Sequence, residues 1–273
     1  MATPFLSIII PALNEEHFLP KLLESLTTQT DKNFEVIVVD GKSKDKTVEA
    51  AKQFEKRLPK FSVVVADHAS LPYQRNYGAH IAKSQWFVFL DSDDIVYPYT
   101  VSRIHAYIDS HNPPFFTAWC SPDSEVYGDA LFTLLTNMFY AASNMLKRPI
   151  APGPFTGVRR DIFERVGGYD ENHPFLEDQD LSQRIAKLGF LPDIIRETLF
   201  VLSLRRYRKQ GTLKVLQAYA KAVVPIFIFK QTPKNMTGYV MGGHVFDTKS
   251  KVKPSALKRF SKTLKHLVKE VFE

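Results

Sequence analysis

The sequence contains almost no cysteine and no long hydrophobic run. Cys120 is the only cysteine among 273 residues, so no internal disulfide can form, and a reducing compartment suits such a chain. We expect its side chain to be small, hydrophobic and buried. No segment reaches the roughly 18 uninterrupted apolar residues of a membrane-spanning helix, and the apolar run at residues 5–10 is too short for a signal peptide. The sequence therefore predicts a cytoplasmic protein, one that can lie peripherally on the cytoplasmic face of a membrane.

Net charge is also nearly absent from most of the chain. Residues 248–273 hold eight Lys or Arg and two acidic side chains, a net charge of +6, whereas the whole chain carries +7. The other 247 residues therefore carry +1. This split argues against a general nucleic-acid-binding protein and indicates an appended segment that binds a charged surface.

Residues 255–272 have the pattern of a basic amphipathic helix. Apolar side chains recur at helical spacing while lysines occupy the other faces, and such a helix can lie in a membrane interface. Anionic lipids would add about 1 kcal/mol for each Lys or Arg near the surface. A helix packed on the protein body has the same pattern, so both alternatives stay open. The apolar segments 130–146 and 213–229 favour the membrane slightly, although either could form a core, an acceptor groove or a dimer face.

The first 120 residues alternate short apolar runs with helical patterns. Such an alternation predicts a mostly parallel sheet with helices on both faces, because strands buried on both sides are continuously apolar. Ligands bind such sheets beyond the carboxyl ends of the strands, where Asn14, Asp40 and Asp91 stand. The predicted strands are residues 6–10, 34–39, 61–66 and 86–90, and the predicted helices are residues 15–28, 45–54 (with Asp45 as the N-cap) and 72–83.

The second half of the chain is less regular. We expect one strand at residues 153–158 and helical segments at residues 126–146, 161–166, 178–188 and 213–229, the last broken by Pro225.

The strongest chemical signal is residues 87–94, FVFLDSDD, where an apolar strand ends in closely spaced carboxylates. Carboxylates this close repel one another unless a cation or water lies between them. Hard oxygen ligands suit Mg²⁺ or Mn²⁺, which can bridge to a diphosphate. We therefore predict a metal site at Asp91 and Asp93, although an isolated pair would more simply be a solvated acidic turn.

Six segments together resemble the inverting family 2 glycosyltransferases of the GT-A fold, over about residues 5–208. Each is weak alone, but their order and spacing indicate the family, with Lys42 standing where Gly or Asp is usual. The segments are residues 9–16 (IIPALNEE), 35–47 (EVIVVDGKSKDKT), 75–79 (RNYGA), 87–94 (FVFLDSDD), 167–171 (GGYDE) and 176–181 (LEDQDL).

The resemblance implies which residues bind the nucleotide sugar. Asp40 would hydrogen-bond the base, and Arg75 would approach the nucleotide. Residues 203–208 (SLRRYR) are similar to a segment of some bacterial members whose arginines could close over the diphosphate, although a basic surface facing lipid headgroups is the alternative. The predicted donor-binding residues are Pro11, Leu13, Asn14, Glu15, Asp40, Arg75, Asp91, Ser92, Arg205 and Arg206.

The resemblance also implies a catalytic carboxylate on the acceptor side. Sugar transfer to a hydroxyl needs a group that accepts its proton, and positive charge that stabilises the departing nucleoside diphosphate. We predict Asp178 as this base, with Glu177 orienting it or contacting the acceptor, and Asp180 as the second candidate. Acidic residues favoured by the helix dipole are the simpler alternative. His244 could complete the metal site, but a loop histidine is the plainer interpretation.

The sequence as a whole predicts an α/β, GT-A-like glycosyltransferase. It would move a hexose from a nucleotide diphosphate sugar to a lipid or glycan, with Mg²⁺ or Mn²⁺. A polyprenyl-phosphate glycosyltransferase is the alternative enzyme, and a non-catalytic nucleotide-sugar-binding protein is disfavoured because the acidic motifs are intact. The Gln/Arg-x-x-Arg-Trp motif of processive synthases is absent, which favours transfer of one or a few sugars. We expect a domain at residues 1–210, with a nucleotide-sugar-binding half (1–120) and an acceptor half (121–210), and a basic helical extension at residues 211–273.

Overall fold

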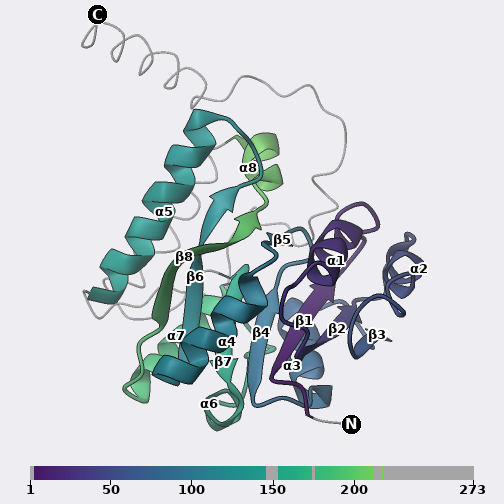
Figure 1. Cartoon of the computed structure of the whole chain (residues 1–273), viewed down its shortest axis with the longest axis horizontal. Helices are drawn as coiled ribbons and strands as arrows, with labels where there is room; N and C mark the ends of the chain where they lie inside the picture. The colour runs from purple at the N-terminus through teal and green to yellow at the C-terminus, as the bar shows by residue number, and fades with distance from the viewer. Residues whose placement is uncertain (1–2, 146–152, 174–175, 212–216, 218–273) are drawn as a thin grey trace, which may run out of the picture.

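A computed structural model describes residues 3–145, 153–173, 176–211 and 217. Eight strands form one mixed sheet in the order β3-β2-β1-β4-β7-β6-β8-β5, with helices on both faces (Figure 1). The predicted α/β class is confirmed. The strands are β1 Leu6–Ala12, β2 Phe34–Asp40, β3 Phe61–Val65, β4 Trp86–Leu90, β5 Ile95–Val96, β6 Phe115–Pro122, β7 Phe155–Arg159 and β8 Asp193–Leu202.

The N-terminal half follows the predicted alternation. Strands β1 to β4 lie where the apolar runs predict them, and all their mutual pairs are parallel. Helix α1 begins at Leu19 instead of Glu15, and the backbone N–H groups of residues 14–16 before it donate to side chains of the segment after β2. The helix predicted at residues 45–54 begins two residues later, and Lys46 instead of Asp45 occupies its N-cap position. Asp45 Oδ1 accepts a hydrogen bond from the Thr47 N–H at 3.0 Å. The helices of this half are α1 Leu19–Thr27, α2 Thr47–Lys52, α3 Leu71–Ile81 and α4 Thr100–His111.

The sheet is less parallel than the sequence suggests. Strand β7 runs antiparallel to both β4 and β6, and β5 runs antiparallel to β8. At the β6–β7 contact, a Cβ atom on Gly157 would lie 2.1 Å from the ring of Phe116, so only glycine fits there. The predicted helices at residues 126–146, 161–166 and 178–188 are confirmed as α5, α6 and α7. The predicted helix at residues 213–229 lies outside the described residues, apart from Gln217. Elements α4, β5, β6 and α8 were not foreseen. The remaining helices are α5 Tyr127–Met145, α6 Arg160–Arg165, α7 Glu177–Lys187 and α8 Arg205–Gln210.

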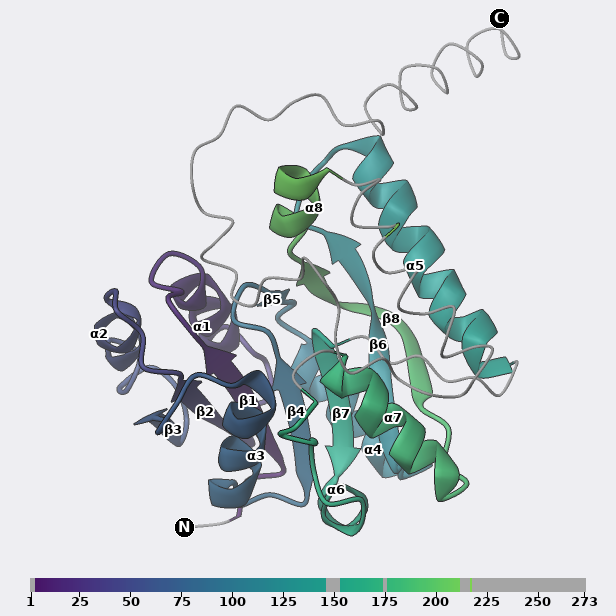
Figure 2. The same ribbon diagram turned by 180° about the vertical axis from the view of Figure 1, so that it is seen from behind.

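Two hydrophobic layers hold the sheet between its helices. Side chains alternate along each strand, so Ile8 and Ile10 of β1 pack with α1 and α4, whereas Ile9 packs with α3 and α7. Figure 1 shows the first pair of helices in front of the sheet, and Figure 2 shows the second pair from behind. Because β1 pairs parallel with both β2 and β4, the carboxyl ends of these three strands lie at one edge of the sheet.

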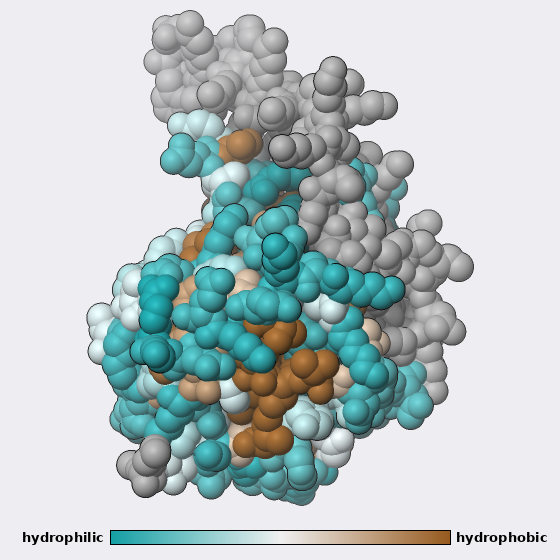
Figure 3. All heavy atoms as spheres, turned by 90° about the vertical axis from the view of Figure 1, so that its right-hand side faces the viewer, coloured by the Kyte–Doolittle hydropathy of each residue, from teal (hydrophilic) through white to brown (hydrophobic). Residues whose placement is uncertain are grey.

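Apolar side chains also remain on the surface. Seen from the β3 edge, an apolar patch stands out against a hydrophilic surround (Figure 3), and Val65 of β3 is 53% exposed. Helix α5 packs on β6 yet exposes Leu135, Met138 and Phe139. No helix among the described residues is long and apolar enough to cross a membrane. Cys120 is free and buried, as predicted, and burial raises the pKa of its thiol to about 12.

Candidate active site

The turns after β1 and β2 are tied to each other. The Asn14 N–H donates to Ser43 Oγ at 2.8 Å, and Asn14 Oδ1 accepts from the Lys44 N–H at 2.7 Å. Asp40 is buried at the end of β2, where its carboxylate accepts from the Ser43 N–H at 2.9 Å and from the Ser43 hydroxyl. Lys42 has a φ of 62°, a conformation that glycine adopts at less cost. These contacts form a rigid double turn at the predicted nucleotide-binding edge.

Gln74 reinforces this edge and was not foreseen. Its buried side-chain amide donates to the Ala12 carbonyl at 2.9 Å and to the Val39 carbonyl at 2.7 Å, joining the ends of β1 and β2. A Cβ atom on Gly41 would approach Gln74 to 2.9 Å. The sequence around Gln74 contains no pattern that predicts these contacts with the ends of two strands.

The DSDD segment places three carboxyl groups directly after β4. Ser92 between them is buried, and Asp94 is buried with neither carboxyl oxygen hydrogen-bonded to a described residue. Burial and the negative charges of Asp93 and Asp91 raise the pKa of Asp94 well above the usual carboxyl range. Burial also raises the pKa of Asp93, against the opposing charge of Arg205. Three carboxyl groups therefore crowd this turn, one more than the two predicted ligands, and burial disfavours the charged forms of Asp93 and Asp94.

Arg205 of α8, which is distant in the sequence, contacts this turn. Its guanidinium binds Asp93 at 2.8 Å and Glu15 at 2.6 Å, and it lies over the ring of Phe18 at 4.2 Å. Three predicted site residues from distant segments therefore meet in one cluster.

Arg75 occupies the centre of a second cluster. Its Nη1 donates to Glu177 at 2.8 Å, and its Nη2 donates to Asp91 at 2.9 Å and to the Gly153 carbonyl at 3.3 Å. The side chain of Arg75 is 1% exposed and lies over the ring of Tyr169, with 5.1 Å between the guanidinium carbon and the ring centroid. The motifs predicted to bind the donor and the acceptor thus contact the same guanidinium.

The acceptor-side pair opens helix α7. Leu176 precedes the helix with a left-handed φ of 54°, so the chain turns sharply into Glu177 and Asp178. A Cβ atom on Gly153 would lie 2.9 Å from Asp178 Oδ2, so this segment passes close over the carboxylate. Burial, followed by the charge of Glu177, raises the pKa of Asp178 to about 7. A carboxylate with this pKa is matched to accept a proton near neutral pH.

Asp180 lies two positions further along the helix, and its carboxylate is paired with Arg184. Its Oδ2 accepts from Arg184 Nε at 2.7 Å, and Arg184 also donates to the carbonyls of Val166 and Gly168. This ion pair anchors α7 to the preceding loop, which gives Asp180 a structural role and leaves Asp178 as the stronger candidate base.

The carboxyl groups after β4 fit a divalent cation. Asp91 and Asp93 side chains are 34% and 18% exposed, and the buried oxygens of Asp94 beside them are unpartnered among the described residues. The described residues contain no group of three or more His, Cys, Asp or Glu side chains arranged to hold a metal. A cation here would therefore take its remaining ligands from the diphosphate and water, as Mg²⁺ commonly does.

Some predicted residues lie apart from these clusters. Pro11 is buried within β1 and Leu13 is half-buried in the turn after it, so both shape the edge through the backbone. Arg206 is half-buried on α8. His244 and the extension beyond Gly211, apart from Gln217, fall outside the described residues. The sequence reasoning missed Gln74, Tyr169 and Asp94, of which the last two stand inside quoted motifs.

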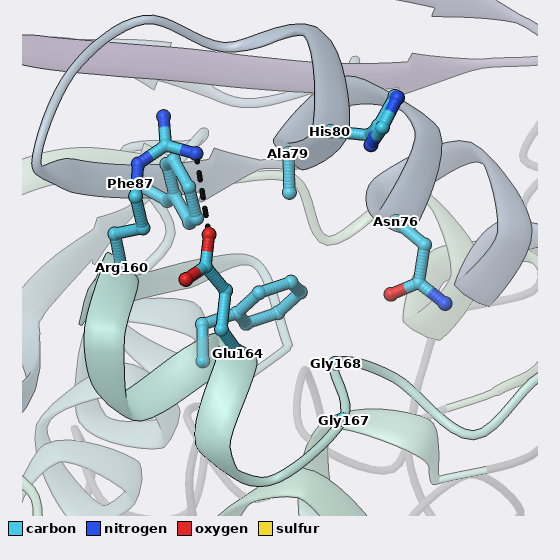
Figure 4. A pocket seen from close by; sticks show the side chains of 9 residues that line it. Asn76, Ala79, His80, Phe87, Arg160, Glu164, Gly167 and Gly168 are labelled. Carbon is cyan, nitrogen blue, oxygen red and sulfur yellow. Dashed lines mark hydrogen bonds and ion pairs between the residues drawn. The ribbon is translucent and has the colours of Figure 1, made fainter.

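A separate hollow of about 370 Å³ lies between α3 and α6. Figure 4 shows Asn76 and His80 on one side of it and Arg160, paired with Glu164, on the other. Its lining includes none of the predicted site residues, so the candidate active site remains the strand-end edge.

Comparison with known proteins gives the family. The profile of Glycosyl transferase family 2 matches residues 7–167. The chain belongs to this family. A PGL/p-HBAD biosynthesis glycosyltransferase of Mycobacterium bovis is 32% identical over 190 residues, covering 67% of this chain and 70% of that protein. An uncharacterized glycosyltransferase of Haemophilus influenzae is 31% identical over 199 residues, covering 71% of this chain and 66% of that protein.

Solved structures share the fold of this family 2 member. Mannosyltransferase PcManGT from Pyrobaculum calidifontis, in complex with GDP-Man and Mn²⁺, superposes with a TM-score of 0.61 at 19% identity, covering 82% of this chain and 65% of that one. S. aureus TarS 1–349, in complex with UDP-GlcNAc, gives a TM-score of 0.60 at 19% identity, covering 73% of this chain and 58% of that one. Both comparisons support the GT-A fold.

Proposed function

We propose that this family 2 glycosyltransferase moves a hexose from a nucleotide diphosphate sugar to a hydroxyl group of a lipid or glycan, with inversion at the anomeric carbon. The observation that carries the proposal is the meeting of Asp91 with Glu177 on Arg75, because it brings a metal-suited turn and a candidate base to one place. Complexes of the same fold with UDP-GlcNAc and with GDP-Man and Mn²⁺ support the donor class and the cation.

Each part of the site has a role in this reaction. Asp178 accepts the acceptor proton as the new glycosidic bond forms, and Glu177 orients it. Asp40 and the double turn hold the nucleotide, while Arg205 lies where it can balance the charge of the diphosphate. Mg²⁺ or Mn²⁺ at Asp91 and Asp93 would supply further positive charge for the leaving group.

A polyprenyl-phosphate acceptor is the second candidate. It is favoured by the exposed apolar surface of α5, which includes Leu135, Met138 and Phe139 and suits a lipid substrate. A phosphate acceptor needs less help from a base than a hydroxyl does, so the two candidates differ in how strongly they depend on Asp178.

Turnover of donor tests the function directly. We expect a panel of UDP-, GDP- and dTDP-hexoses to include at least one that releases nucleoside diphosphate slowly in Mn²⁺ or Mg²⁺ and much less in a chelator. A thermal-shift screen of the same nucleotides would identify the base, because a ligand of the native state raises its melting temperature. Binding of a nucleotide sugar without release under any condition would contradict an enzymatic role and favour a binding protein.

Because the C-terminal extension is basic, we also propose that the protein binds the cytoplasmic face of a membrane. We expect full-length protein to co-sediment with anionic vesicles and to be partly released by salt, since the Debye length falls to about 3 Å at 1 M. A variant lacking residues 248–273, which carry +6, should stay in the supernatant yet still hydrolyse donor. Neutral vesicles are the control. Full-length protein that ignores anionic vesicles at every salt concentration would indicate a packed structural helix.

A further inference from the structure

Arg75 binds two carboxylates of the protein itself, those of Glu177 and Asp91. It lies in the middle of α3, and both terminal nitrogens of its guanidinium already donate, one to Glu177 and the other to Asp91 and the Gly153 carbonyl. The resemblance to relatives suggests instead that this arginine approaches the nucleotide. With both terminal nitrogens engaged and 1% of the side chain exposed, contact with a protein carboxylate pair accounts for its position better.

The aromatic ring of Tyr169 packs against the Arg75 guanidinium and restricts its orientation. Tyr169 is buried beneath Arg75, and its ring meets Phe89 of β4 edge-on, with 5.1 Å between centroids. Phe163 of α6 also packs edge-on against Tyr169 at 5.8 Å. A planar fork held this way fixes the angle between two carboxylates, which a single ammonium group cannot do.

The two carboxylates belong to different parts of the reaction. Asp91 follows β4 in the donor-binding half, whereas Glu177 begins α7 and directly precedes Asp178. We propose that Arg75 is a positioning residue that clamps Asp91 and Glu177 together and thereby holds Asp178 at a fixed place relative to the donor. This clamp rests on the proposed function, because it assigns Asp178 to the acceptor side of a sugar transfer.

The clamp also sets the charges around Asp178. Glu177 on its own helix, Asp91 after β4 and Tyr169 below face it with negative or acidic groups, and Arg75 from α3 is the positive one. The acid limb of kcat/KM should lie near the Asp178 pKa of about 7. Removing a neighbouring negative charge moves this limb to lower pH, and removing the positive charge moves it to higher pH.

Four variants test the clamp, with Arg160→Met as the matched control. Arg160 also stacks on an aromatic ring, that of Phe87 at 4.6 Å, and donates to the carbonyls of Ser84 and Ala82, but it touches no site residue. The test variants are Arg75→Lys, Arg75→Met, Glu177→Gln and the double variant Arg75→Met/Glu177→Gln. Donor hydrolysis and transfer, their pH profiles, the affinity for UDP or GDP with Mn²⁺, and the melting temperature are measured for each.

The clamp predicts a specific pattern. Arg75→Lys keeps the charge but loses the fork, so kcat should fall at least about tenfold while nucleotide affinity changes much less. Glu177→Gln should move the acid limb to lower pH by about one unit, and Arg75→Met should move it upward. Arg75→Met leaves the buried carboxylate of Glu177 and the partly exposed carboxylate of Asp91 without their cation. The variant should melt at a lower temperature, and the double variant should partly restore it. Arg160→Met should keep the parent kcat and pH profile.

Distinct results would overturn the clamp and the proposed function. Parent kcat and pH profile in Arg75→Lys would overturn the clamp, as would a loss of nucleotide affinity that accounts for the whole change in kcat/KM. Additive shifts of melting temperature in Arg75→Met and Glu177→Gln would also overturn it, even if no donor is turned over. A parent protein that turns over no donor, with non-additive melting shifts, would refute the proposed function and leave the clamp standing.

Discussion

Asp178→Asn is expected to lower the transfer rate by about 10² to 10⁴ while nucleotide binding stays nearly unchanged. The substitution keeps the shape of the side chain and removes the proton acceptor at the start of α7. It should not lower the melting temperature above pH 7, because burial opposes ionisation of Asp178 and asparagine carries no charge to bury. The measurements are kcat at saturating donor and acceptor, and the Kd for nucleotide by titration calorimetry.

The pH profile of the parent protein gives a second measure of the same group. Because the base works only when ionised, the rate should fall about tenfold for each pH unit below the Asp178 pKa of about 7. A profile that stays flat down to pH 5 would remove Asp178 from the role of base.

Asp180→Asn is the matched control for this substitution. Asp180 lies on the same helix, but its carboxylate is engaged by Arg184, so the variant should keep most of its transfer rate. A severe loss in Asp180→Asn with a mild one in Asp178→Asn would transfer the role of base to Asp180. Mild losses in both would favour a phosphate acceptor, and hence the polyprenyl-phosphate candidate.

Asp93→Ala is expected to abolish the cation-dependent part of nucleotide binding. Even outer partners of a bound metal are worth about 10- to 100-fold in affinity, so loss of a direct ligand should cost at least about 100-fold. The variant also releases Arg205, which binds Asp93 at 2.8 Å. Titration of UDP, GDP and dTDP with Mn²⁺ and with a chelator measures the effect.

Asp123→Ala provides the control for removing a carboxylate that pairs with α8. Asp123 binds Arg208 of that helix, away from the turn after β4, so cation-dependent binding should persist in the variant. Equal affinity of the parent protein with Mn²⁺ and with chelator would contradict the metal assignment.

Strands β1 to β4 and helices α1 to α3 could be predicted because their signals are local. The runs that became β1, β2 and β4 are almost entirely apolar, with Ser7 and Glu35 as exceptions, and this composition is typical of strands buried on both faces. The start of α1 could not be placed, since it depends on the left-handed turn at Asn14 and its bonds to the loop after β2.

Strand pairings and side-chain contacts between segments distant in the sequence could not be predicted from local patterns. The antiparallel insertion of β7 depends on Gly157 facing Phe116 across the sheet, a contact that neither segment announces alone. The sequence motifs predicted Arg75, Asp91 and Glu177 as site residues, but they did not predict that these residues contact one another. Arg75 and Glu177 are 102 positions apart and Arg205 and Glu15 are 190 apart, so only the folded chain brings them together.

The position of β7 has a consequence for how such enzymes can diversify. Because β7 lies between β4 and β6, the half of the chain that we propose to bind the acceptor supplies a central strand to the sheet of the proposed donor-binding half. Residues 1–114 alone would leave β4 with an open hydrogen-bonding edge, and exposed edges of this kind recruit other chains. Acceptor specificity therefore cannot be exchanged between relatives by swapping a C-terminal module at residue 120. A viable chimera has to carry β7 with a β4 that matches it, or to exchange only the loops beyond the strand ends.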